Sequence, residues 1–232
     1  MPNFALFQGD PDELAIVIAF DPGGTTGYCV MGVPPDGLAS SSGLRDALSY
    51  IDYGQIDCGT RHGQTGLGMK RGHEGLNMSG EIDGIVRMIN ILDSFDTCAV
   101  VLEDFVLDVS KANMGRDLLT PVRIIAGFST LLHYSFGPEV MKGIFIQNRS
   151  LAKTTCTDDR LKNWNLYDGS SGAHARDATR HAFYFLRDCC GSSDNARLKR
   201  HLAWPHLFDD PEIRPVEKVT KKQVGQRVWG LG

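Results

Sequence analysis

The stretch that decides the fold is IVIAFDPGGTTGYCV, residues 16–30. It begins with an apolar run long enough for one buried strand, turns at Pro-Gly-Gly, and continues into a second strand-like run. Asp21 ends the first run, so its carboxylate lies at a rigid strand end, beside backbone that glycine allows to come close. Asp before Pro-Gly is also a common turn residue, and this stretch alone therefore leaves the role of Asp21 open.

Outward from this hairpin, strands alternate with helices. Strands are expected at 16–21, 27–33, 48–58, 98–103 and 141–146, and helices at 81–95, 120–136, 150–163 and 173–190. The order predicts an α/β fold with a mixed five-stranded sheet flanked by helices. Thr120 is expected to cap the second helix, with Pro121 in its first turn. Two apolar stripes predict buried helix faces: Ile82, Ile85, Val86, Ile89 and Leu92 in one helix, and Ala175, Ala178, Ala182, Phe185 and Cys189 in another.

Charge divides the chain in two. Residues 1–190 hold 16 basic and 23 acidic residues, whereas residues 191–232 hold 8 basic and 5 acidic ones. We therefore expect one domain over residues 1–190, with its core from about residue 16, and a basic C-terminal extension over residues 191–232. A basic tail on an acidic body suits a protein that grips phosphates and holds cations, and it equally suits a solvated tail.

Composition excludes several classes of protein. No apolar run approaches the roughly 18 residues of a membrane span, and the acidic N-terminus lacks the basic region of a secretory signal, so a cytoplasmic protein is expected. The six cysteines form no CxxC pair, which predicts buried thiols rather than a zinc site or a disulfide framework.

Acidic residues at element ends indicate a metal site. Asp21 ends the first strand, Glu103 ends the apolar strand CAVVLE, and Asp177 follows His174 by three residues, one helical turn, in HARDATRHAF. Carboxylates brought together from distant parts of a chain suit Mg²⁺ or Mn²⁺, and two such ions can hydrolyse a phosphodiester. Each also has a simpler interpretation, as a turn residue, a salt-bridge partner or a helix N-terminal residue.

These segments resemble RuvC-type Holliday junction resolvases, which have the ribonuclease H-like superfold. The likeness spans residues 16–190 and is carried by IVIAFDPGGTTGYCVMGV, VVLEDF and HARDATRHAFYFLR. TPVRIIAG and AKTTCTDDRLKNW add a similarity to RuvC-like proteins of actinobacterial phages. The long glycine-rich loop at 59–79 and the basic tail depart from the bacterial pattern, so the substrate could differ.

The resemblance implies a function. Asp21, Glu103, His174 and Asp177 would form the catalytic and metal-binding set, with two Mg²⁺ or Mn²⁺ ions. The protein would be a homodimeric endonuclease that resolves Holliday junctions or other branched DNA, in the host bacterial cytoplasm if it is phage-encoded. Asp104 points to the opposite strand face and is a poorer ligand. His181 lies one turn beyond Asp177 and could contact the site, although a structural helix histidine is the simpler interpretation.

DNA contacts are expected from basic residues in the loops and at helix ends. The main candidates are Lys70, Arg71, Lys111, Arg116 and Arg123, and further candidates are Lys153, Lys199, Arg200, Lys218, Lys221 and Lys222.

Two other functions remain open. An ATPase or phosphotransferase of the actin and sugar-kinase superfamily also has an Asp-Gly-Thr hairpin, but it needs a second such hairpin, which this chain lacks. A non-catalytic module that binds branched DNA would share the fold without the chemistry. Flap, replication-fork and RNA–DNA hybrid substrates also stay open, because fold does not decide substrate.

Overall fold

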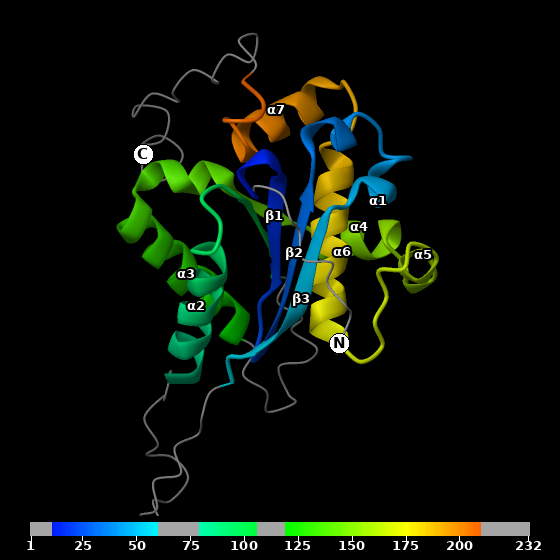
Figure 1. The fold of residues 1–232 in the computed structure, drawn as a ribbon. Helices are drawn as coiled ribbons and strands as arrows, with labels where there is room; N and C mark the ends of the chain where they lie inside the picture. The colour runs from blue at the N-terminus through cyan, green and yellow to red at the C-terminus, as the bar shows by residue number, and fades with distance from the viewer. Residues whose placement is uncertain (1–10, 60–78, 106–118, 210–232) are drawn as a thin grey trace, which may run out of the picture.

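A computed structural model describes residues 11–59, 79–105 and 119–209. Its centre is a five-stranded sheet in the order β3-β2-β1-β4-β5 (Figure 1). The strands are β1 (Ala15–Asp21), β2 (Thr25–Val33), β3 (Tyr50–Asp57), β4 (Ala99–Glu103) and β5 (Ile144–Gln147). The first three strands pair antiparallel, whereas β4 is parallel to β1 and β5 is parallel to β4. The predicted mixed five-stranded sheet is confirmed.

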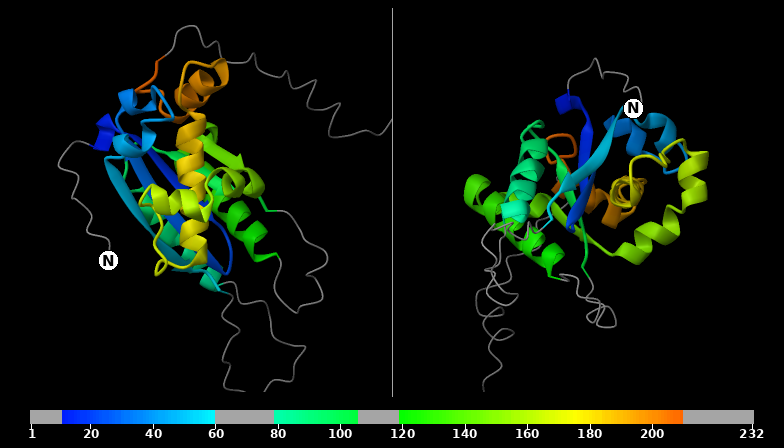
Figure 2. Two further views of the ribbon diagram at one scale, coloured as in Figure 1. Left: turned by 90° about the vertical axis from the view of Figure 1, so that its right-hand side faces the viewer. Right: turned by 90° about the horizontal axis from the view of Figure 1, so that it is seen from below.

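Helices cover both faces of the sheet (Figure 2). Helices α2 (Ser79–Leu92) and α3 (Thr120–Phe136) lie on one face, and the long helix α6 (Ala173–Asp188) lies on the other. Alternate strand residues supply the two cores: Phe20 and Leu102 face α2 and α3, whereas Ala19 and Val101 face α6. Asp21 follows Ala19 by two residues and Glu103 follows Val101 by two, so both carboxylates also lie on the α6 side of the sheet.

Short elements complete the structure. They are the 3-10 helices η1 (Pro11–Glu13), η2 (Pro35–Leu38) and η4 (Pro138–Gly143), and the helices α1 (Leu44–Ala47), α4 (Arg149–Thr155), α5 (Asp158–Asn163) and α7 (Asp194–Ala203). Among the described helices, none combines the length and the apolar character that crossing a bilayer requires.

Two expected boundaries were wrong. The single helix expected over 150–163 is broken at Cys156, because Thr157 caps the backbone N–H of Arg160 and starts α5. The strand expected over 141–146 begins only at Ile144 and runs to Gln147, since Pro138 starts a 3-10 turn before it. As a result, Gln147 belongs to the sheet.

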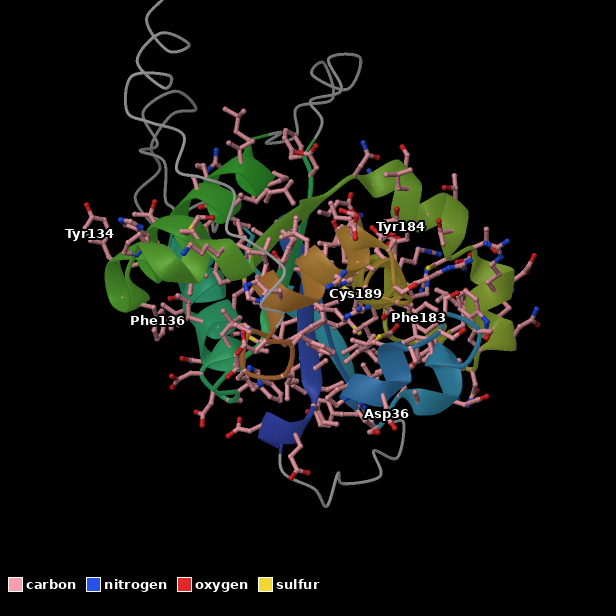
Figure 3. All side chains as sticks on the ribbon, turned by 90° about the horizontal axis from the view of Figure 1, so that it is seen from above. Asp36, Tyr134, Phe136, Phe183, Tyr184 and Cys189 are labelled. Atoms are coloured by element: carbon pink, nitrogen blue, oxygen red, sulfur yellow. The ribbon has the colours of Figure 1, made fainter. Side chains whose placement is uncertain are left out.

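The predicted buried face is confirmed in α6 and is partly wrong in α2. The stripe of α6 is buried throughout, as expected, and Figure 3 shows Phe183 on this helix and Cys189 at its C-cap. In α2, however, Ile82 is 55% exposed and Val86 is 47% exposed, because the inward face carries Gly84 and the buried Glu81 instead.

The start of α3 also differs from the expectation. Leu119 occupies the N-cap position, one residue before Thr120, and makes no side-chain capping bond. The Thr120 hydroxyl accepts a hydrogen bond from Arg123 at 3.0 Å instead. At the other end of α3, Tyr134 is 81% exposed and projects outward with Phe136 (Figure 3).

The described core extends beyond residue 190. Helix α7 packs near the C-terminal half of α6, where Arg200 donates hydrogen bonds to the carbonyls of Cys189 and Gly191 and Lys199 pairs with Asp188. Trp204 follows α7 and is fully buried in the same core cluster as α6. Its Nε1–H donates to the carbonyl of Ile16 in β1 at 2.7 Å. Residues 191–208 are thus part of the packed domain.

Replacing Trp204 with Ala should lower the free energy of unfolding by about 3–5 kcal/mol, because it removes a large buried side chain and leaves a cavity. Urea denaturation followed by circular dichroism measures this change. His206→Ala, two residues away on an exposed side chain, should change the same quantity by less than about 0.5 kcal/mol. Equal midpoints for the two variants would show that residues after 190 do not support the core.

Candidate metal centre

The centre begins at two neighbouring strand ends. Strand β1 ends at Asp21 and the parallel strand β4 ends at Glu103, with Phe20 paired to Leu102 in the register. Parallel neighbours end at the same edge of a sheet, so the two carboxylates lie side by side at one level. Asp21 and Glu103 are each only 7% exposed. The strand sequences therefore deliver two largely buried carboxylates to one point.

Helix α6 brings the third carboxylate. Asp177 is buried, and one of its oxygens lies with oxygens of Asp21 and Glu103 in a group whose members are all within 4.8 Å of one another. His174 stands outside this group but contacts it, since its Nδ1 lies 2.7 Å from Oδ2 of Asp21. A carboxylate only accepts hydrogen bonds, so Nδ1 is the donor. A neutral His174 ring then keeps its lone pair on Nε2, available to a metal ion.

The first turn of α6 reaches this position because of a glycine in β2. A Cβ built on Gly27 would lie 2.0 Å from the carbonyl oxygen of His174, so a larger residue would push the helix away. Gly172 precedes the helix with a φ of 86°, a left-handed conformation that glycine adopts without strain. Gln55 in β3 holds the same turn through a 2.8 Å hydrogen bond from its Nε2 to the carbonyl of Ser171.

Burial and mutual contact shift two of these groups. Burial raises the pKa of the Asp21 carboxyl above its usual range, against the opposing effect of the hydrogen bond from His174; the nearby carboxylates of Glu103 and Asp177 raise it further. The hydrogen bond to Asp21 raises the pKa of His174, against desolvation. The N–H that His174 donates thus stabilises the negative charge of Asp21.

Basic side chains surround the carboxylates. Lys153 Nζ lies 2.6 Å from Oδ2 of Asp177, and Arg149 Nε lies 3.1 Å from Oε1 of Glu103. Both come from α4, which follows directly after β5. Arg180, one turn beyond Asp177 in α6, pairs with Asp177 and with Asp158 of α5. Arg180 is also held by a 3.0 Å hydrogen bond from its Nε to the carbonyl of Cys156.

A buried histidine lies behind Glu103. His181 is completely buried, with Nε2 at 2.8 Å from Oε2 of Glu103 and Nδ1 at 2.6 Å from Oε1 of Gln147. Gln147 ends β5 and is the register partner of Glu103. Glu103 is therefore contacted from two sides, by Arg149 on one oxygen and by His181 on the other.

The sequence-predicted residues divide into three groups. Asp21, Glu103 and Asp177 come together, His174 contacts them through Asp21, and Asp104 is exposed outside the carboxylate group.

Among the basic candidates for DNA contact, Arg123 forms an ion pair with the buried Glu81, with its Nε 3.0 Å from Oε1. This pair joins α3 to α2, and the contact of Arg123 with DNA stays a prediction. Seven other basic candidates lie outside the described residues: Lys70, Arg71, Lys111, Arg116, Lys218, Lys221 and Lys222.

Sequence reasoning missed Gln147, Arg149 and Arg180. The signal for Arg180 was available, because it stands three residues after Asp177 on the same helix face. Gln147 and Arg149 were hidden by the misplaced end of β5, which made both residues look like loop.

The donor set fits a hard divalent cation. Three carboxylates within 4.8 Å, with an imidazole alongside, offer the oxygen-rich environment that Mg²⁺ and Mn²⁺ prefer. The same carboxylates are also partly neutralised by Arg149, Lys153 and Arg180. The centre can therefore hold a cation, and it can also exist as an ion-pair network.

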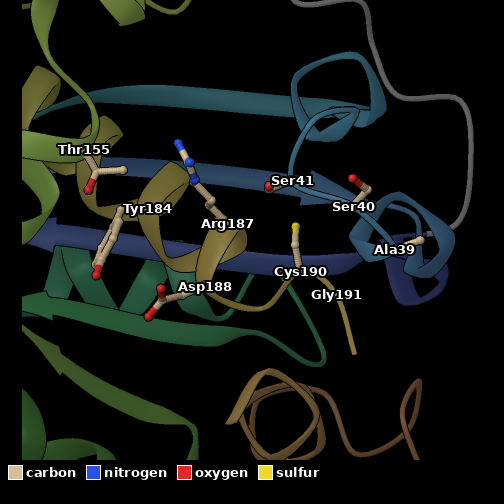
Figure 4. Close-up of a pocket in the computed structure, with 9 residues that line it drawn as sticks. All are labelled: Ala39, Ser40, Ser41, Thr155, Tyr184, Arg187, Asp188, Cys190 and Gly191. Atoms are coloured by element: carbon tan, nitrogen blue, oxygen red, sulfur yellow. The ribbon is translucent and has the colours of Figure 1, made fainter. Parts of the chain in front are cut away.

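A separate hollow lies toward the other end of α6 (Figure 4). It has a volume of about 390 Å³ and is lined by Ala39, Ser40, Ser41, Thr155, Tyr184, Arg187, Asp188, Cys190 and Gly191. None of the four predicted site residues lines it, so this hollow is separate from the carboxylate centre.

Comparison with known proteins found a similarity in structure and no match in sequence. No protein-family model matches the chain, and no curated protein does. Among solved structures, RuvC of T. thermophilus in complex with a Holliday junction substrate is similar, with a TM-score of 0.46 and 12% sequence identity over 75% of this chain and 93% of that chain. At this identity the likeness concerns the fold and not the activity. The fold itself rests on the strand order and directions above, and the assignment to the actinobacterial phage type stays a prediction.

Gly27→Ala should separate α6 from β2, because the added methyl would meet the backbone of His174. We expect the free energy of unfolding to fall by at least about 2 kcal/mol, as in other overpacked sites, and Mn²⁺ binding to weaken. Gly24→Ala is the matched control: its Cβ would come no closer than 4.0 Å to the backbone of Gly59. Urea denaturation and calorimetric titration with MnCl₂ measure both effects, and identical behaviour of the two variants would contradict the close-approach interpretation.

Proposed function

We propose that this protein is a divalent-metal-dependent, structure-selective DNA endonuclease that cuts Holliday junctions or other branched DNA by phosphodiester hydrolysis. The observation that carries the proposal is the meeting of Asp21, Glu103 and Asp177 from two strand ends and one helix. In sequence these residues belong to the three motifs that resemble RuvC-type resolvases.

Asp21, Glu103, Asp177 and the Nε2 atom of His174 would hold the metal, as Mg²⁺ or Mn²⁺. Bound there, two such ions would activate a water molecule for attack on phosphorus and stabilise the departing 3′-oxygen, leaving a 5′-phosphate. His174 has to lose one proton before it can act as a ligand, and its hydrogen bond to Asp21 fixes which nitrogen is left free. Asp21 thereby acts both as a ligand and as the group that orients His174.

Arg149 and Lys153 are suited to contact the phosphate next to the cleaved bond. Their side chains are 57% and 32% exposed, and ion pairs of such exposure contribute little to stability. Cations that enter the centre would release both side chains from Glu103 and Asp177, and a phosphate group would then be their natural partner. Arg180 is only 12% exposed and is held by α5, so it would keep neutralising Asp177 instead.

Selection of four-way junctions and a homodimeric state stay predictions from the sequence resemblance. A two-fold symmetric enzyme would suit a pseudo-two-fold junction. The kinase-like alternative needs a second Asp-Gly-Thr hairpin, which the sequence lacks. The non-catalytic module differs from the proposal in one measurable respect, cleavage.

Glu103→Gln should reduce cleavage of a labelled synthetic four-way junction in Mg²⁺ by at least about 100-fold, because it removes a charged oxygen ligand while keeping the side-chain shape. Asp104→Asn is the matched control, since it makes the same chemical change at the neighbouring, exposed position. It should cleave within about threefold of the wild type. Duplex, flap and RNA–DNA hybrid substrates, tested in parallel, identify the preferred structure.

Three results would count against the proposal. Equal loss in both variants would deny Glu103 a special role, and wild-type cleavage in EDTA would exclude dependence on a metal ion. Tight junction binding without cleavage of any substrate would favour the non-catalytic module.

Lys153→Gln should weaken junction binding and make it less dependent on salt. Removing one phosphate contact reduces the slope of log K against log salt concentration by about 0.9. Fluorescence anisotropy of a labelled junction measures this slope between about 50 and 200 mM KCl, with Ca²⁺ in place of Mg²⁺. Lys162→Gln, an exposed lysine of α5 that pairs with Asp159, is the control and should keep the wild-type slope. An unchanged slope for Lys153→Gln would leave this lysine as a partner of Asp177 alone.

A further inference from the structure

His181 is a polar residue in a place where a helix would ordinarily put an apolar one. It lies on the buried face of α6 among Ala178, Ala182 and Phe185, and its exposure is zero. Burying an imidazole is unfavourable unless its nitrogen atoms find partners. Both nitrogens do so here, with Glu103 and Gln147.

The three residues form one connected unit at the sheet edge. Glu103 and Gln147 are register partners at the ends of β4 and β5, and His181 lies over both of them. Because the Glu103 carboxylate only accepts hydrogen bonds, His181 Nε2 carries the hydrogen that binds it. Nδ1 lies 2.6 Å from the side-chain amide of Gln147, whose oxygen accepts when Nδ1 carries a hydrogen and whose nitrogen, with the amide turned over, donates when it does not.

We propose that His181, itself oriented by Gln147, is a positioning residue that fixes the rotamer of Glu103 and leaves Oε1 of that carboxylate directed to the metal. The proposal deepens the function given above and rests on Glu103 being a ligand. It assigns no proton transfer and no direct metal contact to His181. The effect acts through one hydrogen bond to Oε2, at 2.8 Å.

The arrangement of charges explains why Glu103 needs such a partner. On its Oε1 side stands Arg149, whose side chain is 57% exposed and free to move when a cation or DNA arrives. On its Oε2 side stands His181, which is enclosed by the core and cannot follow. When Arg149 leaves, only the fixed partner keeps the carboxylate in place. Groups that orient metal ligands in this way typically change metal affinity by about 10–100-fold.

Two amide substitutions separate the two hydrogen bonds of the ring. In His181→Gln the amide nitrogen reaches the position of Nε2 and can still donate to Glu103, whereas in His181→Asn it reaches only the position of Nδ1, toward Gln147. Each variant keeps one hydrogen bond and loses the other, so the two should lose similar stability. We expect His181→Asn to bind Mn²⁺ about 10–100-fold more weakly than the wild type, and His181→Gln to stay within about threefold.

The experiment titrates metal-free protein with MnCl₂ in a calorimeter and records thermal melting in EDTA for each variant. Equal Mn²⁺ affinities for the Asn and Gln variants, at similar melting temperatures, would overturn the positioning role. So would a loss of affinity that simply follows the loss of melting temperature. Wild-type affinity in both variants would also reject it.

Cleavage assays on the same proteins separate this proposal from the proposed function. A wild-type protein that cuts junctions, with Asn and Gln variants of equal Mn²⁺ affinity, would keep the nuclease and reject the role of His181. A wild-type protein that cuts nothing, with Mn²⁺ affinity that still follows the hydrogen bond to Glu103, would reject the nuclease and keep the positioning role.

Discussion

Mutual repulsion among three carboxylates is the constraint on which the rest of this structure depends. Asp21, Glu103 and Asp177 offer oxygens within 4.8 Å of one another in a largely buried place. Like charges so close together, with little water between them, are unfavourable unless other groups compensate. The protein supplies these groups as a hydrogen bond from His174, three basic side chains, and the imidazole of His181. A site that needs this much compensation without a cation is well prepared to accept one.

The compensating groups fall into a fixed set and a movable set. Arg180 and His181 are on α6, buried or nearly so, and each is tied to a second element of the fold. Arg149 and Lys153 lie on the short helix α4 and reach the carboxylates from the solvent side. This division separates the geometry of the centre from its charge balance: the fixed groups keep the carboxylates in position, and the movable ones adjust to what is bound.

Much of the fold could be predicted because its signals are local. The apolar strands ending in Asp21 and Glu103, the small-residue stripe of α6 and the three-residue spacing of His174 and Asp177 are all readable along the chain. The contacts of Glu81 were not readable, because the buried face of α2 is decided by Arg123 on another helix. The same holds for His181, whose partners lie 34 and 78 residues away. Trp204 was overlooked because a single aromatic residue in a basic segment carries no periodic signal.

The hydrogen bond between Trp204 and Ile16 has a consequence for how the protein is made. It joins residues 188 positions apart and completes the packing of the strand that ends in Asp21. A ribosome delivers the chain from its N-terminus, so the first strand emerges long before the indole that seals it. His174 also follows Asp21 by 153 residues, so the nascent chain carries unsealed apolar strands and an incomplete centre until these residues have been added. The carboxylate centre is assembled only after Asp177 has been added to the chain, and such long-range closure favours slow folding.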